Sequence, residues 1–245
     1  MIKIIADYHT HTTFSHGKNS IEDNVKRGIE LGLKEIAISD HGYGHMGFGV
    51  RKKDFKRMRE LVNELNKKYV EIDIKLGVEA NVLGVDGTVD MDDETLSYLD
   101  FMFVGYHFGS RPHRLFRDIR MHFANIMSKR SYYWYQEALK MNTQAFLNAL
   151  DRYDILCITH PGAKGPVDIH AIAKKAAEKG TCLEINNQHG HLTVEEIKIA
   201  MEENVQFMIG SDAHHIKDIG VYDNAIKRAL EAGLTIDRIV NAQQR

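Results

Sequence analysis

Two histidines near the start of the chain, His9 and His11, have the spacing of a pair of metal ligands. On an extended segment, side chains two residues apart point to the same side, so both imidazoles can bind one ion. Histidine is the commonest metal ligand in proteins, and this 245-residue chain contains 14 of them. Other histidines and carboxylates follow short apolar runs, and the full candidate set is His9, His11, His16, His41, Glu79, His107, His160, Asp212 and His214.

This candidate set is too large for a single ion. Catalytic zinc takes about three protein ligands and a water molecule, whereas the set holds seven imidazoles and two carboxylates. If the fold brings the set together, the sequence predicts two or three divalent ions. Imidazole and carboxylate ligands suit zinc, manganese and iron alike, so the ligand types do not choose among these metals.

Seven short apolar runs predict the strands that must position these residues. Several lack a period of two, as expected of strands buried on both faces. Longer amphipathic segments separate them, and this alternation predicts a parallel sheet. Seven repeats suit an α/β fold of the closed or nearly closed (β/α)7 barrel type with outer helices; an open doubly wound sheet is the alternative. The predicted strands are Ile2–Ala6, Glu35–Ser39, Ile72–Val78, Phe101–Gly105, Ile155–Thr159, Thr181–Ile185 and Val205–Ile209.

The helices between these strands have recognisable ends. Ser20 is a predicted N-cap for a helix that ends near Gly32, and the segment Lys52–Lys68 is a long charged amphipath. A further helix is predicted to end at Gly180, and Thr193 opens another with a capping box. Each of these segments is long enough to connect two parallel strands.

The barrel explains why residues far apart in sequence converge. Six of the seven predicted strands are followed within a few residues by His, Asp or Glu. The C-terminal strand ends of such a barrel share one face, where active sites lie. The remaining histidines are interpreted as ordinary surface or core residues: His45, His113, His122, His170, His189, His191 and His215.

Composition narrows the class of protein. The chain has 32 Lys and Arg against 34 Asp and Glu, a net charge of −2, which excludes a globally basic nucleic-acid coat or polybasic membrane binder. Both cysteines, Cys157 and Cys182, lie in apolar runs and need no disulfide framework. The sequence shows no leader pattern, membrane-spanning run or linker. We therefore expect one cytoplasmic domain over residues 1–245 and no membrane partner.

The ordered motifs resemble those of the PHP (polymerase and histidinol phosphatase) family, most closely the small stand-alone bacterial PHP phosphatases. The resemblance covers nearly the whole chain and implies a distorted, TIM-like barrel of seven strands. The motifs that carry it are Asp7-Tyr-His9-Thr-His11, Ser39-Asp40-His41-Gly42, Gly77-Val-Glu79-Ala-Asn81, Gly105-Tyr-His107, Thr159-His160-Pro161-Gly162, Leu183-Glu-Ile-Asn186-Asn187 and Gly210-Ser-Asp212-Ala-His214.

The resemblance also implies a trinuclear centre, with zinc as the first expectation and manganese or iron as alternatives. It assigns the ligands in three groups: His9, His11, Glu79 and Asp212 to a first ion, Glu79, His107 and His160 to a second, and His16, His41 and His214 to a third. Glu79, Asp212 and His214 are the expected catalytic residues. Asp7 and Asp40 are expected to orient ligand imidazoles through the second ring nitrogen; the alternative is that they cap strand ends.

The implied activity is that of a metal-dependent phosphoric ester hydrolase. A metal-bridging hydroxide would attack a small phosphomonoester while two ions clamp the phosphoryl group. The alternatives are a histidinol-phosphate phosphatase specifically, or a nuclease or 3′-end-processing phosphoesterase, with nucleic acid a less favoured partner. A non-catalytic, metal-stabilised interaction module is weaker still, because no ligand position is missing.

A basic segment, residues 108–152, separates the fourth and fifth strands. Its eight Lys and Arg against three acidic residues give a net charge of +5. Arg111 and Arg117 are candidates to bind substrate phosphate, since guanidinium groups pair well with phosphate oxygens. The alternative is an amphipathic helix pair with a solvated basic face and an aromatic core stripe. The glycine-rich segment 42–49 is interpreted as a mobile loop over the site or a plain surface loop.

Overall fold

Seven parallel strands form the frame of the molecule. The computed structural model describes residues 2–244, and in it each strand of this sheet pairs with its neighbours in sequence order. The strands are β2 (Ala6–Asp7), β3 (Glu35–Ile38), β4 (Asp73–Asn81), β5 (Phe101–Gly105), β6 (Cys157–Ile158), β7 (Cys182–Asn186) and β8 (Phe207–Gly210). The predicted strand number and parallel direction are confirmed.

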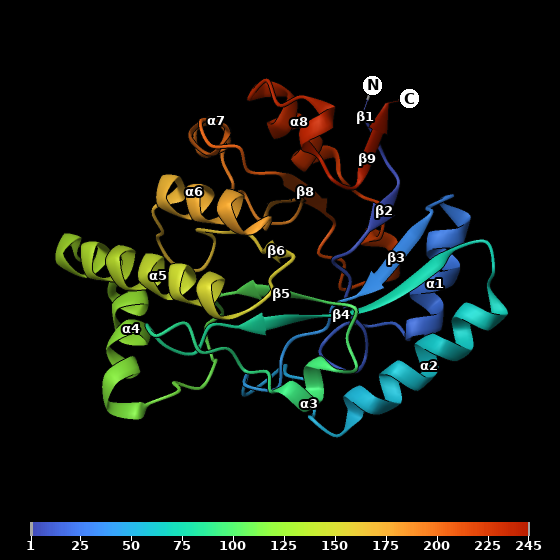
Figure 1. The fold of residues 1–245 in the computed structure, drawn as a ribbon, viewed down its shortest axis with the longest axis horizontal. Helices are drawn as coiled ribbons and strands as arrows, with labels where there is room; N and C mark the ends of the chain where they lie inside the picture. The colour runs from blue at the N-terminus through green and yellow to red at the C-terminus, as the bar shows by residue number, and fades with distance from the viewer. Residues whose placement is uncertain (1, 245) are drawn as a thin grey trace.

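The sheet curves into a nearly closed barrel, as predicted, with β2 and β8 as its outermost strands (Figure 1). Just beyond these two strands, Thr10 forms a parallel bridge with Ala213. The His11 N–H donates to the Ala213 carbonyl at 2.8 Å, and the Ala213 N–H donates to the His9 carbonyl at 3.1 Å. These bonds join the first and last strand ends, which carry several of the candidate ligands.

The first predicted strand, Ile2–Ala6, is in fact two strands. β1 (Ile2–Ile4) pairs antiparallel with β9 (Ala242–Gln244) near the other end of the chain, and β2 alone enters the barrel. Between them, the Ile5 N–H donates to the Asn241 carbonyl at 3.0 Å. The single-strand prediction was wrong because no local pattern marks a pairing between the two ends of the chain.

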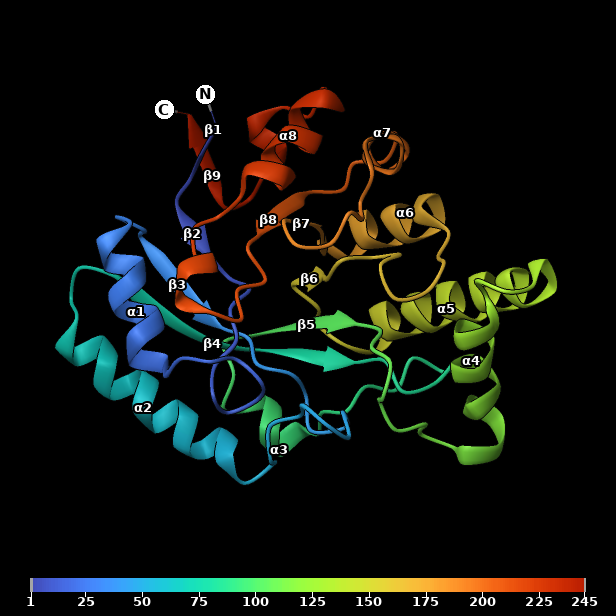
Figure 2. The ribbon, with the colours of Figure 1, turned by 180° about the vertical axis from the view of Figure 1, so that it is seen from behind.

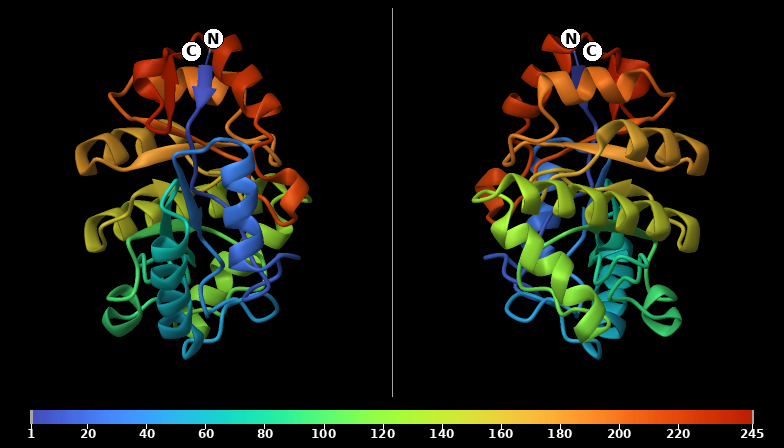
Figure 3. Two further views of the ribbon diagram at one scale, coloured as in Figure 1. Left: turned by 90° about the vertical axis from the view of Figure 1, so that its right-hand side faces the viewer. Right: turned by 90° about the vertical axis from the view of Figure 1, so that its left-hand side faces the viewer.

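Helices surround the barrel. Figures 1 and 2 show α1–α3 on one side, α6–α8 on the opposite side, and the α4–α5 pair at the end towards which β4 and β5 point. The same wrapping is visible end-on in Figure 3. The helices are α1 (Ile21–Glu30), α2 (Asp54–Lys68), α3 (Asp93–Leu96), α4 (Leu115–Met127), α5 (Tyr132–Arg152), α6 (Ile169–Lys179), α7 (Val194–Met201) and α8 (Asp223–Glu231), with short 3-10 helices at Ile216–Asp218 and Ile236–Arg238. Among residues 2–244, no helix is both long and apolar enough to cross a membrane.

The residues predicted to begin or end helices do so in the structure. Ser20 and Thr193 each close a capping box at the start of a helix, which satisfies main-chain N–H groups that have no partner within the helix. Gly180 ends α6 in the left-handed conformation at φ 71°, which glycine adopts without the steric cost that a Cβ would bring.

The basic segment forms α4 and α5, the helix pair of the second interpretation. Its aromatic residues, however, do not form a core stripe. Tyr132 is 80% exposed and Tyr133 is 56% exposed, while Phe116 on α4 is 96% exposed. That part of the prediction was wrong because neighbouring helices do not cover this face.

An apolar plug fills the barrel beneath its C-terminal face. Phe103, Cys157, Cys182 and Met208 are buried together, and strand register places Glu79 beside Phe103. The ring centroid of His9 lies 5.9 Å from that of Phe103. The polar groups above this plug therefore stand on a dry, closely packed floor that limits their movement.

Candidate metal centre

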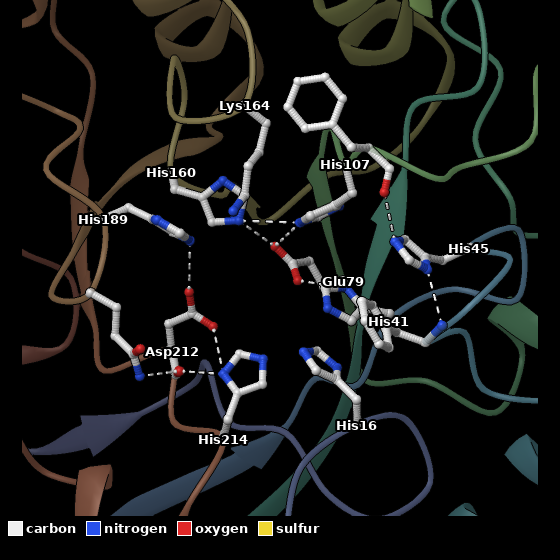
Figure 4. A pocket seen from close by; sticks show the side chains of 13 residues that line it. His16, His41, His45, Glu79, His107, His160, Lys164, His189, Asp212 and His214 are labelled. Carbon is white, nitrogen blue, oxygen red and sulfur yellow. Dashed lines mark hydrogen bonds and ion pairs between the residues drawn. The ribbon is translucent and has the colours of Figure 1, made fainter. Parts of the chain in front are cut away.

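All nine predicted ligands converge on the C-terminal face of the barrel. Each belongs to at least one of four groups whose ligand atoms lie within 4.8 Å of one another. Figure 4 shows most of them pointing into one cavity from different strand ends. The groups are His11, His16, His41 and His214; His9, His11 and Asp212; His41, Glu79 and His107; and His160, His189 and Asp212. This arrangement agrees with the prediction that the ends of strands distant in sequence meet on one face.

Glu79 lies at the centre of the cluster, and its two oxygens face different imidazoles. Oε1 is 2.9 Å from His160 Nε2 and 3.3 Å from His107 Nε2. Oε2 is 2.9 Å from His41 Nδ1 and 3.5 Å from His9 Nε2. A carboxylate placed in this way could contribute one oxygen to each of two ions.

Asp212 faces a second set of imidazoles. Its Oδ1 lies 3.2 Å from His11 Nε2 and 3.5 Å from His9 Nε2. The same oxygen is 3.6 Å from His214 Nδ1. Asp212 therefore lies between His9 and His214, and its carboxylate is close enough to bind an ion held by either histidine.

Two of the candidate ligands have a main-chain conformation that non-glycine residues rarely adopt. His160 has φ 29° and Asp212 has φ 53°. Such a conformation costs roughly 1–3 kcal/mol and persists where the surroundings hold it in place. Here the His160 N–H donates to Glu184 at 2.8 Å, and Gln188 donates to the Asp212 carbonyl at 2.7 Å. The strained main-chain conformations therefore occur at two residues whose side chains would bind metal.

The buried polar atoms of the cluster fit a set of metal ligands. A buried polar atom without a partner costs roughly 1–3 kcal/mol. Within residues 2–244, seven buried atoms of the cluster make no hydrogen bond of acceptable geometry: His9 Nε2, His11 Nδ1 and Nε2, His16 Nδ1, His41 Nδ1, and Glu79 Oε1 and Oε2. Divalent cations would satisfy nitrogen and carboxylate lone pairs of this kind together.

Electrostatics set different protonation states within the cluster. Burial opposes the charge of Glu79, yet the nearby imidazoles of His107 and His9 outweigh it and hold the pKa of Glu79 well below its usual value. Burial also opposes the charge of Asp212, but the imidazole of His9 holds the pKa of Asp212 well below its usual value. Burial lowers the pKa of His107 to about 3, whereas at His9 the carboxylates of Glu184 and Asp212 outweigh burial and raise the pKa. The two carboxylates are therefore ionised, and His9 must release a proton when it binds a metal.

Glu184 supports the cluster from below and was missed by sequence reasoning. Its Oε1 lies 2.6 Å from His9 Nδ1, and its Oε2 accepts from the His160 N–H at 2.8 Å and from Asn186 Nδ2 at 3.0 Å. Gly210 leaves the space for it, since a Cβ there would lie 2.1 Å from Glu184 Oε1. The sequence did hold one signal for Glu184: an acidic residue inside an otherwise apolar predicted strand indicates a buried carboxylate with a specific partner.

The two aspartates expected to orient imidazoles behave differently. Asp7 accepts from the Ser211 N–H at 3.4 Å and the Gly220 N–H at 3.3 Å, and within residues 2–244 it contacts none of the nine ligands. Glu184, and not Asp7, contacts the second ring nitrogen of His9. The prediction that Asp7 orients a ligand imidazole was therefore wrong, and the alternative that Asp7 caps a strand end fits its hydrogen bonds. Asp40 Oδ1 lies 3.9 Å from His11 Nδ1 but accepts from the Thr12 N–H at 2.7 Å. Asp40 therefore acts mainly on the main chain next to His11.

A hydrogen-bonded relay fixes His107. Its Nδ1 lies 2.8 Å from Asn81 Oδ1. Asn81 in turn donates from Nδ2 to the buried carboxylate of Asp90 at 2.6 Å, and the Gly44 N–H donates to the same oxygen at 2.7 Å. Asp90 thus ties the ligand His107 to the glycine-rich segment 42–49, a connection that no sequence pattern indicated.

The cavity over the cluster has a volume of about 300 Å³ and walls beyond the predicted ligands. The additional lining residues are His45, Phe48, Phe108, Lys164, Gln188 and His189. His189 Nε2 lies 3.6 Å from Asp212 Oδ2, and His45 Nε2 lies 2.9 Å from the Phe108 carbonyl oxygen. Both histidines, interpreted from the sequence as ordinary residues, therefore lie in the wall of the cavity, and His189 also belongs to one of the four groups. His189 follows the end of β7 by three positions, so the strand-end argument could have included it.

The two arginines predicted to bind substrate lie outside this lining. Arg117 donates from Nε to Asp118 Oδ1 at 2.7 Å and from an amino group to Asp86 Oδ2 at 3.0 Å, so its guanidinium is already paired. Arg111 is exposed, and its N–H donates to the Gly44 carbonyl at 3.0 Å. Lys164 supplies the positive charge of the described cavity wall instead (Figure 4).

Comparison with known sequences gives a consistent result. Residues 7–213 match the family model of the PHP domain. A probable phosphatase of Thermoanaerobacter sp. (strain X514) is 28% identical over 98% of this chain and 91% of its own length. A probable phosphatase of Shewanella loihica is 29% identical over 98% of this chain and 90% of its own length.

Solved structures share the barrel. Histidinol phosphate phosphatase from Lactococcus lactis, in complex with zinc, L-histidinol and phosphate, has a TM-score of 0.61 and 17% identity, with 94% of each chain covered. A chain from the metal-dependent tyrosine phosphatases of Bacillus subtilis and Streptococcus pneumoniae has a TM-score of 0.51 and 18% identity, covering 91% of this chain and 85% of the other. At these identities the likeness supports the fold.

Proposed function

The chain belongs to the PHP domain family of metal-dependent phosphoesterases, and from that premise we propose that it removes phosphate from a small phosphomonoester at a centre of three divalent ions. Following the family resemblance, we assign the first ion to His9, His11, Glu79 and Asp212, the second to Glu79, His107 and His160, and the third to His16, His41 and His214, all of which lie in the cluster. Imidazole and carboxylate ligands suit zinc, manganese and iron alike; zinc is the first choice because the histidinol phosphate phosphatase of similar fold was solved with zinc.

One observation supports this proposal above the others. The two oxygens of Glu79 face different groups of imidazoles. Oε1 lies 2.9 Å from Nε2 of His160, which is assigned to the second ion, and Oε2 lies 3.5 Å from Nε2 of His9, which is assigned to the first. Oε2 is also 2.9 Å from Nδ1 of His41, which is assigned to the third ion. A carboxylate that is buried and shared between two imidazole groups is the arrangement expected of a bridging ligand in a site that clamps a phosphoryl group.

Hydrolysis adds one water molecule to the ester. The water oxygen bonds to phosphorus, the bond from phosphorus to the ester oxygen breaks, and that oxygen leaves with a proton. Divalent ions bound here would neutralise phosphate charge and lower the pKa of the attacking water. The chain itself holds Glu79 and Asp212 ionised beside the imidazoles. His214 is fixed by its Nδ1, 2.8 Å from the Asp212 carbonyl oxygen, which keeps its other nitrogen directed into the cavity.

Lys164 is proposed to bind the substrate phosphate. Its side chain lines the cavity beside His160 (Figure 4), and within residues 2–244 no carboxylate lies within 4.0 Å of its ammonium. We expect Lys164→Met to lower kcat/KM for phenyl phosphate by about 30-fold, mainly through KM, because a charge-assisted hydrogen bond is worth about 2 kcal/mol. Steady-state kinetics of the variant test this prediction. The control is Lys67→Met, which changes an exposed lysine of α2. If the two substitutions had equal effects on kcat/KM, the role of Lys164 would be contradicted.

A substrate panel tests the proposed function itself. The metal-loaded protein is given phenyl phosphate, sugar phosphates, nucleoside monophosphates, histidinol phosphate and single-stranded oligonucleotides. We expect release of inorganic phosphate from the small monoesters. Cleavage of oligonucleotides without hydrolysis of any monoester would contradict the proposal and favour a nuclease. Hydrolysis restricted to histidinol phosphate would narrow the proposal to that substrate.

A further inference from the structure

A second cavity adjoins the first at Lys164. Its volume is about 500 Å³, and it lies between the end of α4, the start of α5, the loop after β6 and the start of α7. Lys129, Tyr135, His191 and Glu196 line it, and Lys164 lines both cavities. We call it the α4–α5 cavity. Lys164 therefore lies at the boundary between the cavity over the metal ligands and this second space.

The loop that forms one wall of the α4–α5 cavity is held in place. Asn125 and Asn142 are buried and exchange two hydrogen bonds, at 2.8 Å and 2.7 Å. Asn142 also donates to the Pro166 carbonyl at 2.9 Å. Gly165 packs so closely that a Cβ there would lie 2.0 Å from Asn125 Oδ1. The wall is therefore pre-formed, which lowers the cost of ordering it when a ligand binds.

Charge in the α4–α5 cavity favours an anion. Among residues 2–244, neither Lys129 nor Lys164 has a carboxylate within 4.0 Å. Glu196, in contrast, is already engaged: it accepts from the Thr193 N–H at 2.7 Å and lies 3.3 Å from His191 Nδ1. Two uncompensated ammonium groups thus flank the space, while its one lining carboxylate is held by other groups.

We propose that the α4–α5 cavity binds the leaving alcohol of the substrate and prefers an alcohol that carries a second anionic group. Lys129 binds that second anion, Lys164 lies between the two phosphates, and the ring of Tyr135, which is 42% exposed, packs against the carbon skeleton. The inference rests on the proposed phosphomonoesterase function and specifies its substrate class.

Pairs of substrates that differ only in the second anion test this preference. The probes are the monophosphates and bisphosphates of butane-1,4-diol and hexane-1,6-diol, with phenyl phosphate as the baseline. We expect kcat/KM to be about tenfold higher for at least one bisphosphate, after division by two for its two equivalent esters, as an added charged hydrogen bond implies. Lys129→Gln should remove that preference and leave phenyl phosphate hydrolysis unchanged, whereas Lys67→Gln should alter neither.

Equal values for each monophosphate and its bisphosphate would overturn the proposal, as would a preference that survives Lys129→Gln. Failure of the proposed function has a different signature, since no monoester, phenyl phosphate included, would then be hydrolysed. In that case, calorimetry with the corresponding mono- and bisphosphonates still tests the cavity. Tighter binding of the bisphosphonate to the wild type than to Lys129→Gln supports the inference, and equal binding contradicts it.

Discussion

Glu79→Gln should lower kcat/KM for phenyl phosphate by about 10³-fold, which corresponds to about 4 kcal/mol of lost transition-state stabilisation. Glutamine has nearly the same shape, but one of its two terminal atoms is an amide nitrogen that cannot bind a cation. Because Oε1 faces His160 at 2.9 Å and Oε2 faces His9 at 3.5 Å, either orientation of the amide replaces the oxygen that would bind one of the two ions.

The measurement combines kinetics with metal analysis of the same preparation. Glu79→Gln should bind fewer ions per chain than the wild type while its circular dichroism spectrum is retained. Glu64→Gln, at an exposed position of α2, is the matched control and should keep full activity. Wild-type activity in Glu79→Gln would contradict the bridging role.

Glu184→Gln should have the next largest effect, a loss of about 10- to 100-fold in metal affinity or kcat/KM, as is typical when a partner of a metal ligand is changed. The Glu184 carboxylate contacts His9 Nδ1 at 2.6 Å and accepts from the His160 N–H at 2.8 Å. His9 and His160 are assigned to different ions. One amide nitrogen in place of an oxygen would therefore disturb one side of the centre while leaving every ligand present.

Metal dependence separates this positioning role from a general loss of stability. We expect the activity of Glu184→Gln to rise towards the wild-type value as the zinc concentration is increased, because the ligands remain. Glu195→Gln, an exposed residue of α7, should show no such dependence beyond that of the wild type. A loss of activity that is independent of metal concentration would contradict the positioning role of Glu184.

The candidate ligands were accessible to sequence reasoning because each follows a recognisable strand. His41, His107 and His160 stand one to two residues beyond an apolar run, and the parallel barrel then requires that such positions meet. Glu184 was not accessible in this way. It lies inside its strand, and its partner His9 is 175 residues away, so only the packed structure shows the contact.

The less regular features of the fold depend on pairings between distant segments. The antiparallel pair β1 and β9 joins the two ends of the chain, and no local pattern predicts it. One wall of the cavity is similar: Lys164 lies in the loop after β6, which is held by contacts with α4 and α5. Such positions follow from tertiary packing rather than from hydrophobic period or turn residues.

The number of ions bound per chain tests the central claim most directly. Purified protein is stripped with a chelator, titrated with zinc, and assayed for bound metal and for phenyl phosphate hydrolysis at each step. The proposed centre predicts three ions per chain at saturation, with activity that appears only after more than one ion has bound. Full activity with a single ion per chain, or less than one equivalent bound after supplementation, would contradict it.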